Sequence, residues 1–138
     1  MAKLSVNVNK IATMRNARGG PEPDLMTFVK GIVGWGADGI TIHPRADRRH
    51  ITPEDARMVA SEVRSVETNF EGDVREEFLD LVLQCKPTQC TLVPVSQGEI
   101  TSNHGWLVAR APNLAEVSIG HHLVSHALLV GTEQAQEI

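Results

Sequence analysis

The stretch GITIHPRADRRHI, residues 39–51, begins as a regular β-strand and then turns strongly basic. Ile40 and Ile42 alternate with Thr41 and His43, which is the two-residue period of a strand with two different faces. The next seven residues, PRADRRH, add three arginines and a second histidine. Because unpaired charge is costly inside a protein, we expect the strand to end here and its polar residues to face a site.

The same alternation of strand and helix repeats along the chain. Alternating apolar and polar residues predict five strands, at residues 4–9, 39–43, 66–72, 89–94 and 115–121. Apolar residues at helical spacing predict helices at residues 25–33, 52–63, 73–85 and 123–130. Strands that alternate with helices at this spacing predict an α/β fold, with a parallel sheet and helices on its outside.

Two of the expected helices carry clear local signals. In the first, five residues form one apolar stripe: Leu25, Phe28, Val29, Ile32 and Val33. The second opens with Thr52, a good N-cap residue, and has Pro53 at its first helical position. Both signals place a helix directly after a loop that follows a strand.

Composition excludes several classes of protein. A chain of 138 residues suits one domain, and 41% hydrophobic with 22% charged residues is typical of a globular protein. The net charge of −4 gives no reason to expect nucleic acid as a partner, and no apolar run is long enough to cross a membrane. The N-terminus, MAKLSVNVNK, has no apolar signal core, so we expect a cytoplasmic protein with Cys85 and Cys90 reduced.

Polar residues gather where the expected strands end. They are Asn7, Asn9, Lys10, His43, Arg45, Glu71, Thr101, Gly120 and His121. Arg15 and Arg18 precede two glycines in IATMRNARGG, and arginine side chains with glycine backbone amides suit a phosphate group. A histidine and a glutamate that face one cavity suit proton transfer near neutral pH. The residues themselves therefore indicate an enzyme that acts on small phosphorylated metabolites.

Each of these residues also has a simpler explanation. Arg48 and Arg49 suit a solvated surface, and Glu71 before a glycine suits a turn. His122 and His126 lie one helical turn apart, as zinc ligands can. The spacing fixes no third ligand, so we expect no metal site. The functional interpretation depends on the coincidence of several clusters at equivalent strand ends.

The sequence resembles the pyridoxine 5′-phosphate synthase family of vitamin B6 biosynthesis. The resemblance is carried by VNVNKIATMRNARGG, GADGITIHPRADRRHI, NFEG, KPTQCTLVP with EITSNHGW, and EVSIGHHLVSHALLVG. It implies a TIM (β/α)8 barrel, commonly assembled into an octamer, and hence self-association. It also implies condensation of 1-deoxy-D-xylulose 5-phosphate with 3-amino-2-oxopropyl phosphate, without a metal or an organic cofactor.

The resemblance assigns a role to each candidate residue. His43 would be a general base, and Glu71 a second acid–base group near the forming ring. The phosphate of the amino ketone would contact Asn7, Arg18, Gly120 and His121. The deoxyxylulose phosphate would contact Asn9, Lys10, Arg45, His50 and Thr101. Many family members have an Asp-His pair where this chain has Asn9 and Lys10, although lysine can also contact a phosphate.

The chain is much shorter than a closed barrel, which needs at least about 200 residues. In this interpretation it is one incomplete barrel of about five βα units, the first four at residues 1–105 and the last at residues 106–138. The family's segment between them is missing, and with it a further catalytic histidine that donates a proton. The alternative function is therefore a non-catalytic remnant that binds phosphorylated ligands or serves as an oligomeric scaffold.

Overall fold

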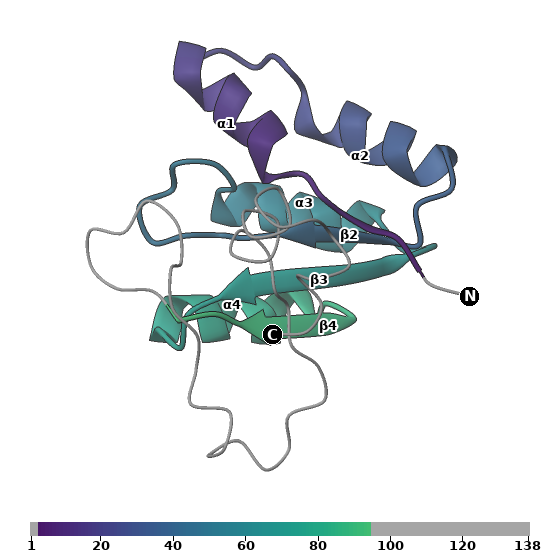
Figure 1. The fold of residues 1–138 in the computed structure, drawn as a ribbon. Helices are drawn as coiled ribbons and strands as arrows, with labels where there is room; N and C mark the ends of the chain where they lie inside the picture. Colours follow the sequence, from purple (N-terminus) through teal and green to yellow (C-terminus); the bar gives the residue numbers. More distant parts are fainter. Residues whose placement is uncertain (1–2, 95–138) are drawn as a thin grey trace, which may run out of the picture. The chain divides into compact units, whose positions relative to one another are not determined.

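The computed structural model describes residues 3–94, which form a parallel sheet with helical connections (Figure 1). The four strands are β1 (Ser5–Asn7), β2 (Gly39–Ile42), β3 (Glu67–Gly72) and β4 (Gln89–Leu92). The helices are α1 (Asn9–Arg18), α2 (Leu25–Gly34), α3 (Pro53–Glu62) and α4 (Glu76–Cys85). None of these helices is long and apolar enough to span a bilayer. The fifth expected strand and the last expected helix lie outside the described residues.

The order of the strands in space is their order in the sequence, β1-β2-β3-β4, and all neighbouring pairs are parallel. A doubly wound sheet reverses direction near its middle, whereas a β/α barrel adds each new strand on the same side. The described sheet has no reversal. The predicted α/β class is thus confirmed, and the arrangement fits part of a barrel.

One helix was missed by the sequence interpretation. The residues after β1 were expected to be a phosphate-binding connection, but they form α1, which contains Arg15 and Arg18. The helix ends at Gly19, whose φ of +65° is readily adopted by glycine and whose N–H donates to the carbonyl of Asn16. Two helices therefore connect β1 to β2. Helix α4 also begins at Glu76, three residues later than expected.

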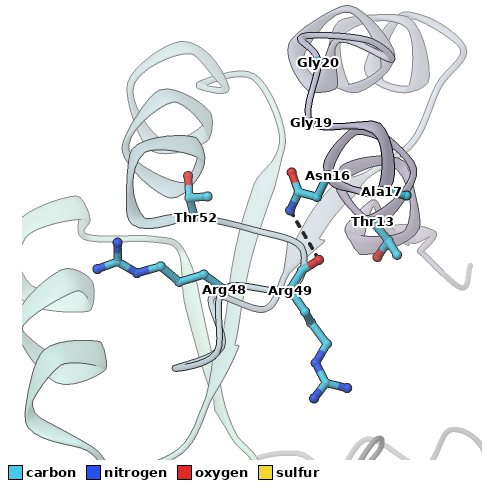
Figure 2. A pocket seen from close by; sticks show the side chains of 8 residues that line it. All are labelled: Thr13, Asn16, Ala17, Gly19, Gly20, Arg48, Arg49 and Thr52. Atoms are coloured by element: carbon cyan, nitrogen blue, oxygen red, sulfur yellow. Dashed lines mark hydrogen bonds between the residues drawn. The ribbon is translucent and has the colours of Figure 1, made fainter.

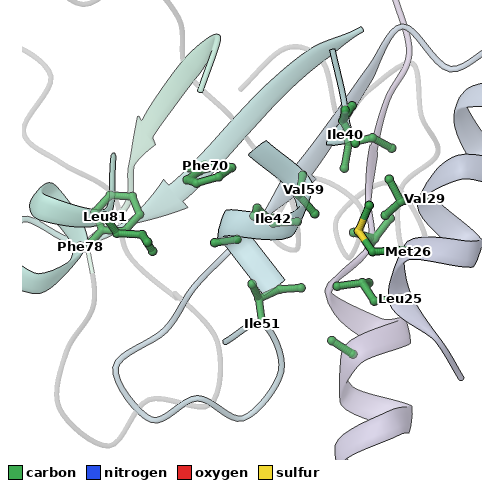
Figure 3. Close-up of a cluster of buried hydrophobic side chains, with 14 residues drawn as sticks. Leu25, Met26, Val29, Ile40, Ile42, Ile51, Val59, Phe70, Phe78 and Leu81 are labelled. Atoms are coloured by element: carbon green, nitrogen blue, oxygen red, sulfur yellow. The ribbon is translucent and has the colours of Figure 1, made fainter. Parts of the chain in front are cut away.

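One face of the sheet forms the core with the helices (Figure 3). Ile40, Ile42 and Phe70 point from β2 and β3 toward apolar side chains of the helices, and all three are fully buried. The helical side chains of this core include Leu25, Met26, Val29, Ala56, Val59, Phe78 and Leu81. Phe28 was expected in the stripe of α2 but is 43% exposed, because Met26 occupies the buried face in its place.

The start of α3 agrees with its sequence signal. Thr52 is the N-cap, Pro53 is the first helical residue, and the Thr52 side chain accepts a hydrogen bond from the Asp55 N–H. The Asp55 carboxylate in turn accepts from the Thr52 N–H at 2.9 Å, which completes a capping box. This cap fixes the point at which the basic loop after β2 joins α3.

The sheet face opposite the helices carries polar side chains that connect all four strands. Ser5 and Thr41 join their hydroxyl groups at 2.9 Å, and the Asn69 amide donates to the Thr41 hydroxyl at 3.5 Å. The Thr91 hydroxyl donates to the Asn69 carbonyl oxygen at 2.9 Å. Since each polar group has a partner, this face can remain polar without unsatisfied groups.

We predict that Gly72→Ala destabilises the protein. An added Cβ would lie between 2.5 and 2.6 Å from three ring carbons of Phe78, which is fully buried and cannot move aside. Overpacking of this kind costs about 1–3 kcal/mol, which urea unfolding measures. Gly20→Ala is the control, since nothing lies within 4 Å of its added Cβ. Equal stability of the two variants would contradict this packing.

Candidate active site at the carboxyl ends of the strands

His43 directly follows β2 and is held there by its backbone. Its N–H donates to the Asn9 side-chain oxygen at 2.9 Å. Burial, followed by the nearby side chains of His50, Arg45 and Arg75, lowers the pKa of His43 to about 4. The ring nitrogen Nε2 is buried and has no hydrogen-bond partner within residues 3–94. His43 is therefore neutral at physiological pH and has the protonation state that a general base requires.

Glu71 lies near the end of β3, beside His43. The parallel register pairs Ile42 with Phe70. The residues that follow them, His43 and Glu71, therefore occupy neighbouring positions at the carboxyl ends of β2 and β3. The Asn7 amide at the end of β1 donates to the Glu71 carboxylate at 3.3 Å. Burial raises the pKa of Glu71. A carboxyl group that holds its proton more tightly than usual can exchange protons with a substrate nearer to neutral pH.

The basic loop after β2 compensates part of its own charge. Asp47 accepts from the Arg45 guanidinium at 3.2 Å and from that of Arg49 at 2.6 Å. Burial opposes the ionised form of Asp47, but the hydrogen bonds from Arg49 and Arg45 outweigh it and lower the pKa of Asp47. The Arg45 side chain is only 10% exposed. An anion at Arg45 would therefore have to share this arginine with Asp47.

One hydrogen bond determines which ring nitrogen of neutral His50 carries the hydrogen. Its Nδ1 accepts a hydrogen bond from the Ile51 N–H at 2.9 Å, so the neutral ring carries its hydrogen on Nε2. Burial, followed by the charge of Arg45, lowers the pKa of His50. The ring centroids of His50 and His43 are 5.9 Å apart. His50 can thus donate one hydrogen bond close to His43.

The residues that were expected to bind phosphate after β1 do not all lie close together. Asn9 and Lys10 begin α1, where Asn9 contacts the His43 backbone and Lys10 is exposed. Arg18 is the last residue of α1, about 13 Å farther along the helix axis at 1.5 Å per residue. The structure therefore does not group Arg18 with Asn7. Thr101, Gly120 and His121 lie outside the described residues.

Sequence reasoning also misassigned one arginine. Arg15 was read as a possible phosphate ligand, but its guanidinium binds the Asp55 carboxylate at 2.7 Å. The two residues are 40 positions apart, so no local pattern revealed the pair. The signal that was present is Asp55 itself, which stands three residues after the N-cap Thr52 and is almost completely buried. A buried carboxylate calls for a cationic partner.

An open pocket of about 650 Å³ lies between the end of α1 and the loop before α3 (Figure 2). Its lining residues are Thr13, Asn16, Ala17, Gly19, Gly20, Arg48, Arg49 and Thr52. Figure 2 shows the guanidinium groups of Arg48 and Arg49 pointing in different directions, while the Asn16 amide donates to the Arg49 carbonyl. The arginines do not converge on one anion, and neither His43 nor Glu71 lines this pocket.

The structure offers no metal centre within residues 3–94, where no group of three or more His, Cys, Asp and Glu side chains could hold an ion. Cys85 and Cys90 are both free thiols. His122 and His126 lie outside the described residues. The side chains at the described strand ends carry imidazole, carboxyl, amide and guanidinium groups.

We predict that His43 makes the fold acid-sensitive. Its pKa is about 4 in the folded chain and 6.5 for the ordinary side chain, so the unfolded state binds the extra proton as the pH falls between these values. The stability that neutral His43 contributes is present above pH 6.5 and is lost as the pH falls through 4. In His43→Gln, unfolding free energy should depend less on pH in this window, by up to about 1.4 kcal/mol per pH unit. Urea unfolding at several pH values measures this slope, and identical slopes would refute the placement of His43.

Comparisons with known proteins show the family to which this chain belongs. The family model described as pyridoxal phosphate biosynthesis protein PdxJ matches residues 4–111. A pyridoxine 5′-phosphate synthase of Flavobacterium johnsoniae is 57% identical over 77% of this chain and 44% of its own length. The proteins of that name from Christiangramia forsetii and Leptospira biflexa are 54% and 50% identical, over 44% and 46% of their lengths. The chain spans less than half the length of these curated relatives. It belongs to the PdxJ family of pyridoxal phosphate biosynthesis proteins.

Proposed function

We propose that this chain carries the proton-transfer half of a pyridoxine 5′-phosphate synthase site. The reaction would condense 1-deoxy-D-xylulose 5-phosphate with 3-amino-2-oxopropyl phosphate. The observation that supports it best is the neighbouring placement of neutral His43 and of Glu71, whose pKa is raised by burial, at the carboxyl ends of β2 and β3. In parallel α/β proteins, ligands collect at this end of the strands.

Each of the two groups suits a different step of a condensation. Neutral His43 can accept a proton from a carbon or nitrogen of the substrates, because its Nε2 has no partner in the described chain. Glu71 can return a proton to a leaving hydroxyl group, since its carboxyl pKa is raised by burial. Asn7 holds the Glu71 carboxylate at 3.3 Å and so limits its orientations.

The phosphate groups would be bound around this pair. Arg45 and the Nε2–H of His50 supply donors beside His43, and Asn9 and Lys10 begin the helix that faces the same loop. Arg18 at the far end of α1, together with Thr101, Gly120 and His121, would complete the phosphate contacts by their resemblance to the family motifs. The phosphate-binding roles of these four residues are part of what we propose.

A second candidate function is ligand binding without turnover. The observation that favours it is length, since the chain spans 44–46% of the relatives that bear the synthase name. In this case the strand ends would still bind phosphorylated molecules, because several donors for phosphate lie within the described residues. The two candidates differ in whether product forms.

We predict that the purified chain forms pyridoxine 5′-phosphate from the two substrates, as measured by mass spectrometry. His43→Ala should reduce the rate by roughly 10²–10⁴-fold, since it removes a positioned proton acceptor. Arg57→Ala is the matched control, because Arg57 is exposed on α3, where it forms an ion pair with Glu54 at 3.7 Å. Equal rates in the unaltered chain and His43→Ala would remove His43 from the mechanism.

Calorimetry tests the second candidate function, ligand binding without turnover. Calorimetry with 1-deoxy-D-xylulose 5-phosphate should show saturable binding that weakens about tenfold in His50→Ala, because one hydrogen bond to a charged phosphate is lost. Binding without product would favour the non-catalytic function. Product formation with unaltered binding in His50→Ala would contradict the role given to His50.

A further inference from the structure

We propose that Arg15 is a positioning residue for His50: its paired contact with Asp55 holds the loop so that His50 keeps its hydrogen on Nε2. The proposal rests on the proposed function in one respect, which is that His50 meets a phosphate group. The positioning itself is a property of the folded chain and can be measured without any ligand.

The first observation is the pair formed by Arg15 of α1 and Asp55 of α3. Two parallel hydrogen bonds join them, from Nη1 to Oδ1 at 2.7 Å and from Nη2 to Oδ2 at 2.8 Å. The side chains are only 15% and 3% exposed. Burial opposes ionisation of Asp55, but hydrogen bonds from Arg15 and Thr52 outweigh it, and the pKa of Asp55 lies below its ordinary value. A two-point contact of this kind fixes orientation as well as distance.

The second observation is that the same helix also holds the loop backbone at His50. Asn16 donates from its amide to the His50 carbonyl at 2.8 Å and to the Arg49 carbonyl at 3.3 Å. Arg15 Nη2 also reaches the His50 carbonyl at 3.5 Å. The peptide group between residues 50 and 51 is thus held through its oxygen by two neighbouring residues of α1.

The third observation connects this peptide group to the imidazole. Its N–H belongs to Ile51 and donates to His50 Nδ1 at 2.9 Å. The Ile51 side chain is completely buried, which restricts rotation of the peptide further. Since the carbonyl and the N–H of one planar peptide point in opposite directions, fixing the carbonyl toward α1 directs the N–H toward the ring. Nδ1 is then an acceptor, and the hydrogen of the neutral ring lies on Nε2.

Charged groups near His50 do not by themselves select this tautomer. Arg45, Arg49 and Lys10 disfavour the charged ring, whereas Asp47 favours it, so these residues change the pKa of His50. The position of the hydrogen in the neutral ring depends instead on the directed Ile51 N–H. Loss of the Arg15 contact should therefore change the tautomer ratio, which a purely structural ion pair would leave unaltered in the folded protein.

The test is nitrogen NMR of the imidazoles in the full 138-residue chain, with His50 assigned through a His50→Gln variant. The unaltered chain should show His50 almost entirely as the Nε2–H tautomer. In Arg15→Gln the ratio of Nε2–H to Nδ1–H should fall about tenfold, as expected when one directed hydrogen bond is lost. Arg15→Lys should restore only part of the ratio, since lysine keeps the charge but lacks the planar fork. Arg57→Gln, an exposed arginine on α3, should leave it unchanged.

A second variant covers the case in which Arg15→Gln fails to fold. The Asn16 side chain is exposed, and Asn16→Ala removes the shorter contact to the His50 carbonyl. It also removes the hydrogen bond that Asn16 accepts from Arg15 Nε at 3.0 Å, but leaves both hydrogen bonds of Arg15 to Asp55 in place. It should shift the tautomer ratio in the same direction. A lower melting temperature with an unchanged ratio in each folded variant would overturn the proposal.

Titration with inorganic phosphate separates this proposal from the proposed function. If His50 meets phosphate, its Nε2 signal should move on titration in the unaltered chain, and about tenfold more phosphate should be needed in Arg15→Gln. An Nε2 signal that ignores phosphate while the tautomer ratio still depends on Arg15 would refute the phosphate role and support positioning. A signal that moves equally in both proteins, with equal ratios, would support phosphate binding and refute positioning.

Discussion

The parallel pairing of β2 with β3 is the constraint on which the other features depend. With Ile40 opposite Thr68 and Ile42 opposite Phe70, the apolar side chains of these pairs turn toward the helices. The pair between them, Thr41 and Asn69, turns toward the other face. A shift by one residue would place Phe70 on the polar face and Asn69 in the core. The same register places His43 beside Glu71. The core and the candidate site are therefore two results of one alignment.

Ion pairs between arginine and aspartate neutralise part of the positive charge near the site, and His43 remains neutral. Asp47 binds Arg45 and Arg49, and Asp55 binds Arg15, so much of the positive charge of the loop and of α1 has a nearby carboxylate. Enough positive charge remains around His43 that burial and its neighbours together lower its pKa to about 4. A basic loop can in this way prepare an uncharged proton acceptor and still offer donors to an anion.

The parts of the fold that could be predicted from sequence are those fixed by local patterns. Two-residue alternation located β2 and β3, and Thr52 with Pro53 located the start of α3, because strand period and helix caps involve residues close in sequence. The helix α1 was missed since its residues NKIATMRNAR form a weak stripe in which only Ala12 is buried. The Arg15–Asp55 pair joins residues 40 positions apart, and Phe28 lost its expected place to Met26, so both depended on how the helices pack. The sequence predicted that His43, Asn9 and Glu71 lie at the carboxyl ends of neighbouring strands. It did not predict that Arg18 lies at the far end of α1.

The central claim is that the ends of these parallel strands share one ligand. Titration of the 138-residue chain with 1-deoxy-D-xylulose 5-phosphate, followed by backbone amide NMR, tests it most directly. Asn7, His43 and Glu71 should respond with a single dissociation constant, while Asp38 and Glu67, at the opposite ends of β2 and β3, should not move. Different constants for the three residues, or a response centred on Asp38 and Glu67, would show that the strand ends do not form a common site.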